Sequence, residues 1–453
     1  MPFEMPDITQ ISINWEAILA WADLSFFGLI WRLISRGGWI IFLFLTFWAI
    51  AKIINYRSEI NKEKNTRYVL LSIDLPRENE NGPEVTERLF AHLATPASVS
   101  GLKVSGSIFT QPRFSFEIIS LGGKIEFLVR TPVEYRDLVE AAFYGEYPNA
   151  EIKEREDYVE AAPDKFPDPQ YDLWGAEIVL YNKDPYPIRT YPAFEHSLSG
   201  EFKDPISNLL EVLGKIQEGE QIWIQIVITF GGLSWKKKGE KLVADLIGAK
   251  PKEEGGGGIS VFFSNLISKG LWSFAHFIYE TVLGETVTAS ETNVLKKEAP
   301  PSLISFLSPG DKEVVAAIQR KISKIGFRTK FRIIYLAKKE KFSIYRGVTG
   351  VLGALNQFNT LDMNGFKPDD FVKTKTSGFA FQPGRSLAKK QTEILRAYKE
   401  RSLRMGTNGY ILNTEELATI YHFPVTTVEA PLVKKTGSKK GEPPITLPVK
   451  ETF

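Results

Sequence analysis

The sequence predicts an α+β protein made of two successive βαββαβ units, the second interrupted by an insert, behind an N-terminal transmembrane helix. Three observations predict this architecture. An apolar run near the N-terminus has the length of a membrane span, strand-like and helix-like segments then follow in one order, and that order recurs after a Pro-rich linker. The predicted regions are a membrane anchor (1–60), a first unit (61–160), a second unit (170–382, insert 250–308), a helical segment (383–430) and a flexible tail (431–453).

The apolar run covers Gly38–Ile54 and is interrupted by Thr46 and Lys52. With its flanks it approaches the ~20 residues that a helix needs to cross a bilayer. Lipid offers no hydrogen-bond partners to the backbone, and a helix pairs its own N–H and C=O groups. We therefore predict a single-pass membrane anchor. A second apolar stretch at 15–35 carries three Trp residues, and it either lies in the interface or forms another span.

The charges that follow the run predict which side of the membrane the body occupies. They include Lys52, Arg57, Lys62, Lys64 and Arg67. Lys and Arg near a span favour the cytoplasmic side. We therefore expect the protein in the cell inner membrane, with its large domain in the cytoplasm.

The first unit is predicted from alternating strands and one-sided helices. Its elements are a strand at 68–75, a helix at 83–93, strands at 114–121 and 124–130, a helix at 132–147 and a strand at 150–154. Pro83 suits the first turn of a helix, and Gly122-Gly123 suits a hairpin turn. The order βαββαβ is the ferredoxin-like, or split βαβ, pattern.

The second unit repeats this pattern less regularly. Its elements are a strand at 175–181, a helix at 205–216, a strand at 221–230, helices at 235–247 and 309–325, a strand at 328–336, a helix at 342–358 and a closing strand near 371–381. Tyr135-Arg136 and Tyr345-Arg346 stand at the start of corresponding helices in the two units. This repetition suggests an internal duplication.

The insert opens with the flexible run Gly255–Gly258 and continues with the apolar, aromatic segment Ile259–Leu283. That segment is predicted to be a lid, a partner-docking helix or an interfacial membrane helix, because Lys269 and Gly270 argue against a span. Its candidate contact residues are Phe262, Phe263 and Trp272. The tail from Lys434 is rich in Pro, Gly and Lys and is predicted to be disordered.

Composition and motifs argue against several chemistries. The net charge is +2, and the chain has no Cys, which excludes disulfides, thiolate metal sites and a Cys nucleophile. The four His residues are scattered singly. We find no phosphate loop, GxSxG or HExxH motif. The sequence therefore predicts a non-enzymatic protein with no cofactor, metal or catalytic residue.

A basic segment, Arg385–Arg404, is predicted to be a helix. Its candidate contacts to nucleic-acid phosphates or anionic lipid are Lys389, Lys390, Arg396 and Lys399. The alternative is an ordinary solvated helix.

Two segments resemble a known family. Ile411–Pro424 (ILNTEELATIYHFP) is similar to segments that precede the motor domain in conjugation-type ATPases of type IV secretion. Phe114–Ile152 resembles a domain of unknown function from candidate-phyla bacteria, fused to or encoded beside those ATPases. Lys439–Pro444 resembles the lead-in to the motor, and the likeness extends over Tyr68–Pro448. Because this chain stops where the motor would begin, the resemblance implies a separate ATPase.

The resemblance implies a membrane-anchored component of a type IV secretion or conjugation-like transfer machine, forming an oligomer. Tyr421, His422 and Phe423 are its candidate contacts to the ATPase, because aromatic residues are enriched at interface hot spots. Packing at the end of the last helix is their alternative role. Other hypotheses for the whole chain are a membrane-tethered nucleic-acid-binding protein and a cell-envelope scaffold.

Overall fold

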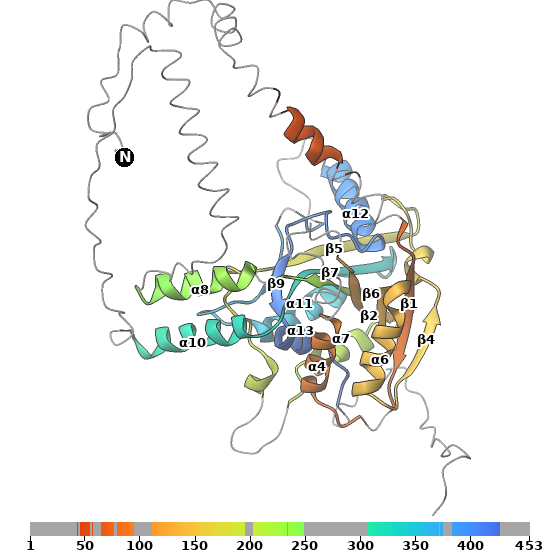
Figure 1. Cartoon of the computed structure of the whole chain (residues 1–453). Coiled ribbons are helices and arrows are strands. Elements are labelled where there is room, and N and C mark those ends of the chain that lie inside the picture. The colour runs from red at the N-terminus through yellow and green to blue at the C-terminus, as the bar shows by residue number, and fades with distance from the viewer. Residues whose placement is uncertain are drawn as a thin grey trace, which may run out of the picture. The chain divides into compact units, whose positions relative to one another are not determined.

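The computed structural model describes residues 43, 46–54, 57, 65–76, 79–94, 111–194, 203–232, 234–248, 307–370, 372–374 and 383–425. The fold is α+β, with an antiparallel sheet. By its internal contacts the chain divides into one unit of residues 62–247 and 303–453 and another of residues 1–61 and 248–302. The sheet belongs to the larger of these two, residues 62–247 and 303–453, whose elements are labelled in Figure 1.

The described elements follow the predicted alternation closely. The strands are β1 (Tyr68–Asp74), β2 (Phe114–Leu121), β3 (Lys124–Pro132), β4 (Glu151–Arg155), β5 (Tyr171–Leu180), β6 (Glu220–Phe230), β7 (Gly326–Lys338), β8 (Phe366–Pro368) and β9 (Tyr410–Asn413). The helices are α4 (Pro83–Leu93), α6 (Arg136–Glu146), α7 (Ser207–Gly214), α8 (Ser234–Leu246), α10 (Pro309–Ser323), α11 (Gly350–Leu355), α12 (Pro383–Lys399) and α13 (Thr414–Ile420).

The strand order is β4-β1-β3-β2-β6-β7-β5-β8, with β9 paired to β7. All of these neighbours are antiparallel. The two predicted units meet where β2 pairs with β6, with Phe114 opposite Ile228 and Leu121 opposite Gln221. The residues predicted to form two domains therefore share one continuous sheet.

The two faces of the sheet are covered differently. Helices α4, α6, α7, α11 and α13 contribute to the core on one face, where Leu89, Phe143 and Leu210 are fully buried. Helix α12 packs on the other face, where Leu395 and Tyr398 join a separate cluster with Trp223. This burial is the main local driving force, since each buried large apolar side chain contributes about 1.5–3 kcal/mol.

One predicted element differs from the structure, and another lies largely outside the described residues. The edge strand described in the second half is β8, which pairs with β5; of the strand predicted near 371–381, residues 371 and 375–381 are outside the described part. The single helix predicted at 342–358 is a π-helical turn (Tyr345–Thr349), then α11, then a 3-10 turn (Asn356–Phe358). The π-helical turn lies closely against Tyr335, because a Cβ atom on Gly347 would come within 2.4 Å of that ring.

The predicted membrane anchor falls largely outside the described residues. Its described part includes a helical stretch at 46–54 with exposed apolar side chains, among them Phe47 at 72% and Ile54 at 60%. Among the described residues, no helix combines the length and the apolar character needed to cross a bilayer. The stretch 15–35 and the insert residues Phe262, Phe263 and Trp272 are also outside the described part.

Candidate functional site beneath helix α12

A row of buried polar side chains crosses the centre of the sheet on the α12 face. It consists of Glu117 of β2, Gln225 of β6, Arg332 of β7 and Glu177 of β5, each directly opposite the next in the strand register. The Gln225 amide donates to Glu117 Oε1 at 3.2 Å. Arg332 donates to Gln225 Oε1 at 3.2 Å and to Glu177 Oε1 at 2.9 Å. The hydrogen bonds therefore continue across four strands and join both halves of the sheet.

Arg401, just after α12, closes one end of the row. Its guanidinium donates to both oxygens of Glu117 at 2.9 and 3.1 Å and to both oxygens of Asp157 at 2.5 and 2.9 Å. Tyr158 donates to Glu117 at 2.8 Å and also contacts the hydroxyl of Tyr398 on α12 at 2.8 Å. Planar, charge-assisted pairs of this kind are among the strongest hydrogen bonds in proteins. They fix the end of α12 to β2 and to the segment after β4.

The backbone of Arg401 is held in a left-handed conformation, with φ at +46°. Its N–H donates to Tyr398 O, and the N–H of Ser402 donates to Ala397 O. These two bonds are those of a Schellman motif, in which the residue at this position is usually glycine. An arginine here costs about 1–2 kcal/mol of backbone strain, which the contacts of its side chain offset.

The loop after Arg401 closes the other end of the row at Glu177. Thr407 donates to Glu177 Oε2 through both its N–H and its hydroxyl, each at 2.6 Å. Lys330 Nζ lies 3.4 Å from Glu177 Oε1 and donates to the carbonyl of Met405. Gly406 has a φ of +84°, and a Cβ atom there would come within 2.3 Å of Glu177. Only a residue without a side chain fits between this loop and the carboxylate.

Burial and neighbouring charges set the protonation of the network. Burial raises the pKa of the Glu117 carboxyl, but Arg401 and the hydrogen bonds from Arg401, Ser115 and Tyr158 outweigh it, so the pKa is lowered. Burial, together with the Glu117 charge, raises the pKa of Tyr158 and Tyr398 well above the usual range. Burial also lowers the pKa of Lys330 to about 8 despite the attraction of Glu177. At neutral pH the carboxylate of Glu117 is ionised and the two phenols are neutral.

The charges of the network balance. Its anions are Glu117, Asp157 and Glu177, and its cations are Arg401, Arg332 and Lys330. Such an arrangement holds the strands in register. A shift of one strand would leave a buried charge without its partner, and an unpaired buried charge costs much free energy. Among the described residues, no group of His, Asp or Glu side chains is arranged to hold a metal ion.

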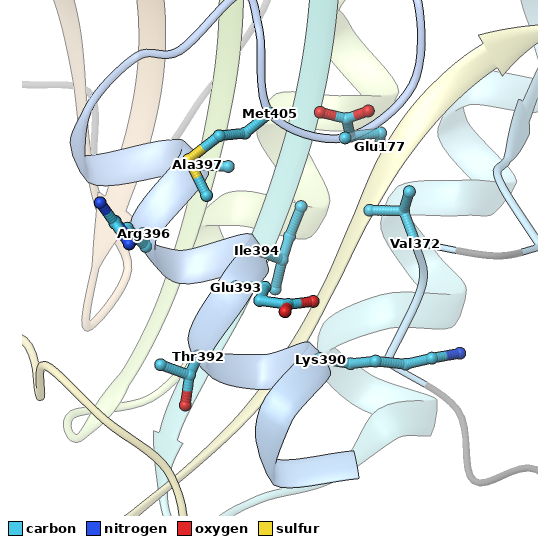
Figure 2. A pocket seen from close by; sticks show the side chains of 10 residues that line it. Glu177, Val372, Lys390, Thr392, Glu393, Ile394, Arg396, Ala397 and Met405 are labelled. Atoms are coloured by element: carbon cyan, nitrogen blue, oxygen red, sulfur yellow. The ribbon is translucent and has the colours of Figure 1, made fainter. Parts of the chain in front are cut away.

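A cavity of about 430 Å³ lies beside the network, between α12, β5 and the loop at Met405-Gly406. Figure 2 shows Ile394 pointing from α12 toward the sheet, with Met405 and Glu177 at one end of the cavity and Lys390 at the other. Val372, Thr392, Glu393, Arg396 and Ala397 complete the lining together with Gly406. The cavity thus combines an apolar floor with charged side chains at its rim.

The four predicted phosphate or lipid contacts do not form one open basic face. Lys389 pairs with Glu393 and Arg396 with Glu400, both along the helix. Lys399 donates to Asp164 and to the carbonyl of Ala162. Only Lys390 reaches the cavity without an ion pair among the described residues. The charges on α12 are largely neutralised by neighbours, as expected of a solvated helix.

The three predicted ATPase contacts near the C-terminus are buried, so the structure corrects their assignment. Tyr421 packs edge-on against Phe116 at 5.0 Å between ring centroids, and Phe423 packs against Phe127 at 4.8 Å. His422 is fully buried, with its ring nitrogens 2.8 Å from Ala418 O and from Asp204. These side chains pack the core next to α13 and offer no surface to a partner.

The polar row was not predicted from the sequence. A signal was present, since each of the four strands has a charged or amide residue near its middle, as in FSFEIISL and QIWIQIVITF, and β7 has three charged residues before its apolar half. Such a residue costs free energy when buried without a partner, so its recurrence in four strands indicates a shared network. The register that aligns the four residues was not predictable from any one strand.

The fold and the network define an α+β protein whose antiparallel sheet is tied together by buried ion pairs. The family model described as Domain of unknown function (DUF8128) matches residues 54–436, and the chain belongs to this family. No curated protein matches the chain.

Proposed function

We propose that this protein is a non-enzymatic, membrane-anchored component of a type IV secretion or conjugation-like transfer machine, working with a separate ATPase. In this proposal the sheet is two fused ferredoxin-like units that serve as a rigid scaffold. The chain would be held in the inner membrane by its N-terminal helix, with the sheet in the cytoplasm.

The observation that carries the proposal is the apolar surface of the helix at 46–54. Phe47, Trp48 and Ile53 are each more than half exposed, which would be costly for a helix surrounded by water. Lys52 and Arg57 stand at its C-terminal side, as the positive-inside rule expects for a cytoplasmic body. A lipid environment accounts for both features.

The buried network supports a scaffolding role over a catalytic one. Its charged groups contact one another across β2, β6, β7, β5 and α12, and they hold one arrangement of these elements. The similarity of Ile411–Pro424 to segments that precede the motor domain in conjugation-type ATPases supports an ATPase partner. At the end of this segment Pro424 O accepts a hydrogen bond from Asn79, and the N–H of the next residue, Val425, donates to Asp204 at 3.1 Å.

Membrane topology tests the anchor. Protease added to intact spheroplasts is expected to leave residues beyond Arg67 protected, and to digest them after lysis. A body cleaved from outside the intact inner membrane contradicts the proposed orientation. A chain recovered entirely in the supernatant after lysis contradicts the anchor itself.

Co-purification tests the partner. The full chain, solubilised from membranes, is expected to retain an ATPase that mass spectrometry identifies, while the chain alone does not hydrolyse ATP. A variant ending at Val425 keeps all of the described core and is expected to lose the ATPase. If that variant keeps the ATPase, the tail is not the contact; if the full chain retains none, the proposed machine is wrong.

A further inference from the structure

Helices α8 and α10 form a two-helix arm at one side of the sheet (Figure 1). Their contact is apolar, with Trp235 and Val243 of α8 clustered with Ile318 and Ile322 of α10. Gly239 allows close packing, because a Cβ atom there would come within 2.4 Å of Ile322. This contact fixes which face of α8 points away from the domain.

The outward face of α8 is rich in lysine. Lys236, Lys237, Lys238 and Lys241 are all exposed. Glu240 and Asp245 are the acidic residues on the same face, and Glu240 lies 3.8 Å from Lys236. Among the described residues, no ion pair forms to the other three lysines.

The spacing of these lysines is unfavourable without a counter-charge. Lys237 and Lys241 are four residues apart and therefore neighbours on the helix surface, where like charges destabilise a helix. An anionic partner would remove this repulsion. The face is therefore better suited to a negatively charged surface than to water.

The position of α8 in the chain indicates which anionic surface is near. The helix ends at Leu246, and the apolar, aromatic segment Ile259–Leu283 follows it in the chain. One of the roles predicted for that segment from the sequence is an interfacial membrane helix. In that role the segment keeps the lysines of α8 close, along the chain, to the lipid headgroups.

We propose that the exposed lysine face of α8 binds anionic lipid headgroups of the membrane that anchors the chain. This inference rests on the proposed function, because it needs the anchor to be in a bilayer. Clusters of Lys beside a membrane segment are attracted to anionic lipids, and the attraction extends about one Debye length, ~10 Å at 0.1 M salt. The contact would orient the sheet relative to the membrane.

A single-cysteine label can measure this contact, because the chain has no native Cys. Ser234→Cys places a fluorophore on the lysine face, four residues before Lys238. The full chain is reconstituted into nanodiscs of phosphatidylcholine, alone or mixed equally with phosphatidylglycerol, each containing a headgroup-nitroxide quencher lipid. We expect stronger quenching in the anionic discs, lost at 1 M salt, where the Debye length falls to ~3 Å.

Two matched variants separate the lysine face from net charge. Replacing Lys236, Lys237, Lys238 and Lys241 with Gln is expected to abolish the extra quenching in anionic discs. Replacing four other exposed lysines with Gln (Lys124, Lys165, Lys215 and Lys339) makes the same charge change and is expected to leave it intact. A label at Asn149→Cys, an exposed residue two positions before β4, should show no dependence on lipid charge, because β4 lies on the other side of the domain in Figure 1. Unchanged thermal melting shows that each variant is folded.

The outcomes distinguish the two proposals. A chain that does not enter nanodiscs at all refutes the membrane anchor and this inference with it. A chain that enters, but whose Ser234→Cys label is quenched equally in neutral and anionic discs, refutes the inference alone. The inference is also overturned if the variant with the four α8 lysines replaced by Gln keeps the extra quenching in anionic discs. If that variant instead loses binding to single-stranded DNA, the face is a nucleic-acid contact.

Discussion

Arg401 combines an unfavourable backbone with the most connected side chain of the buried network. Its left-handed φ suits glycine, yet its guanidinium satisfies both Glu117 and Asp157. The side chain and the backbone therefore make opposite contributions to stability at one position. Two substitutions, one that removes only the side chain and one that also relieves the backbone, can measure the two contributions to stability separately.

Arg401→Ala is expected to destabilise the protein by about 3–5 kcal/mol, because Glu117 stays buried without its cation. Arg401→Gly removes the same side chain but also relieves the left-handed strain. It should therefore be more stable than the Ala variant by about 1 kcal/mol. Urea denaturation of the two variants measures the difference, and equal stabilities would show that the backbone is unstrained.

Tyr421→Phe is expected to be neutral or stabilising by up to about 1 kcal/mol. Among the described residues, its hydroxyl is buried and has no hydrogen-bond partner, so removing it removes a desolvation cost. Tyr158→Phe is the matched control, because it deletes a hydroxyl that donates to Glu117 and should cost about 1–3 kcal/mol. Thermal unfolding ranks the two; a large loss in Tyr421→Phe would reveal a missed partner.

Lys330 is expected to make stability depend on pH. Burial lowers its pKa to about 8 from 10.5, so between these values the unfolded chain binds the proton more strongly than the folded chain. Stability rises with pH wherever the unfolded state binds more protons. The wild type should therefore gain up to about 3 kcal/mol relative to Lys330→Met from pH 8 to 10.5. Exposed Lys339→Met is the control, and parallel pH curves for wild type and Lys330→Met would refute the effect.

At the scale of elements, local patterns predicted most of the fold. Helix α4 and strand β2 have the bounds that their sequences predicted, because Pro83 and the Gly122-Gly123 turn mark the ends locally. Strand β9 and helix α13 were not predicted as such. Tyr410–Asn413 is short, and its pairing with β7 joins residues more than 80 positions apart. The candidate site was missed for the same reason, since it exists only when strands from both halves align.

The segment that follows α12 is expected to be essential for folding. Truncation after Ser402 would remove β9 and α13 and leave Lys321 buried without Glu416, its ion-pair partner at 3.0 Å. We expect the truncated chain to lose cooperative unfolding, whereas truncation after Val425 should not. Circular dichroism melting curves compare the two. A folded chain ending at Ser402 would show that β9 and α13 are dispensable.

The sheet of the described residues is made by joining two halves at β2 and β6. That junction pairs eight residues of each strand, from Phe114–Ile228 to Leu121–Gln221. It also carries the link between Glu117 and Gln225. Neither half therefore completes its own core or its own charge balance.

Residues 62–165 expressed alone are expected to aggregate or self-associate, because the β2 edge and the Glu117 carboxylate lose their partners. Co-expression with residues 166–453 should restore a soluble complex of the two fragments. Size-exclusion chromatography with light scattering distinguishes these states. A stable, folded monomer of residues 62–165 would mean that the first half is independent.

The strand order is symmetric about the middle of the sheet. Counted inward from either edge, the fourth, first, third and second strands of each half follow one another. One consequence concerns the rims, which are occupied by equivalent strands, β4 and β8. These are only five and three residues long, and β4 carries Glu151, Lys153 and Glu154. Short, charged rim strands discourage another chain from adding to a sheet. Self-assembly of this protein is therefore expected to proceed through helices and loops, because strand addition is disfavoured at both described edges of the sheet.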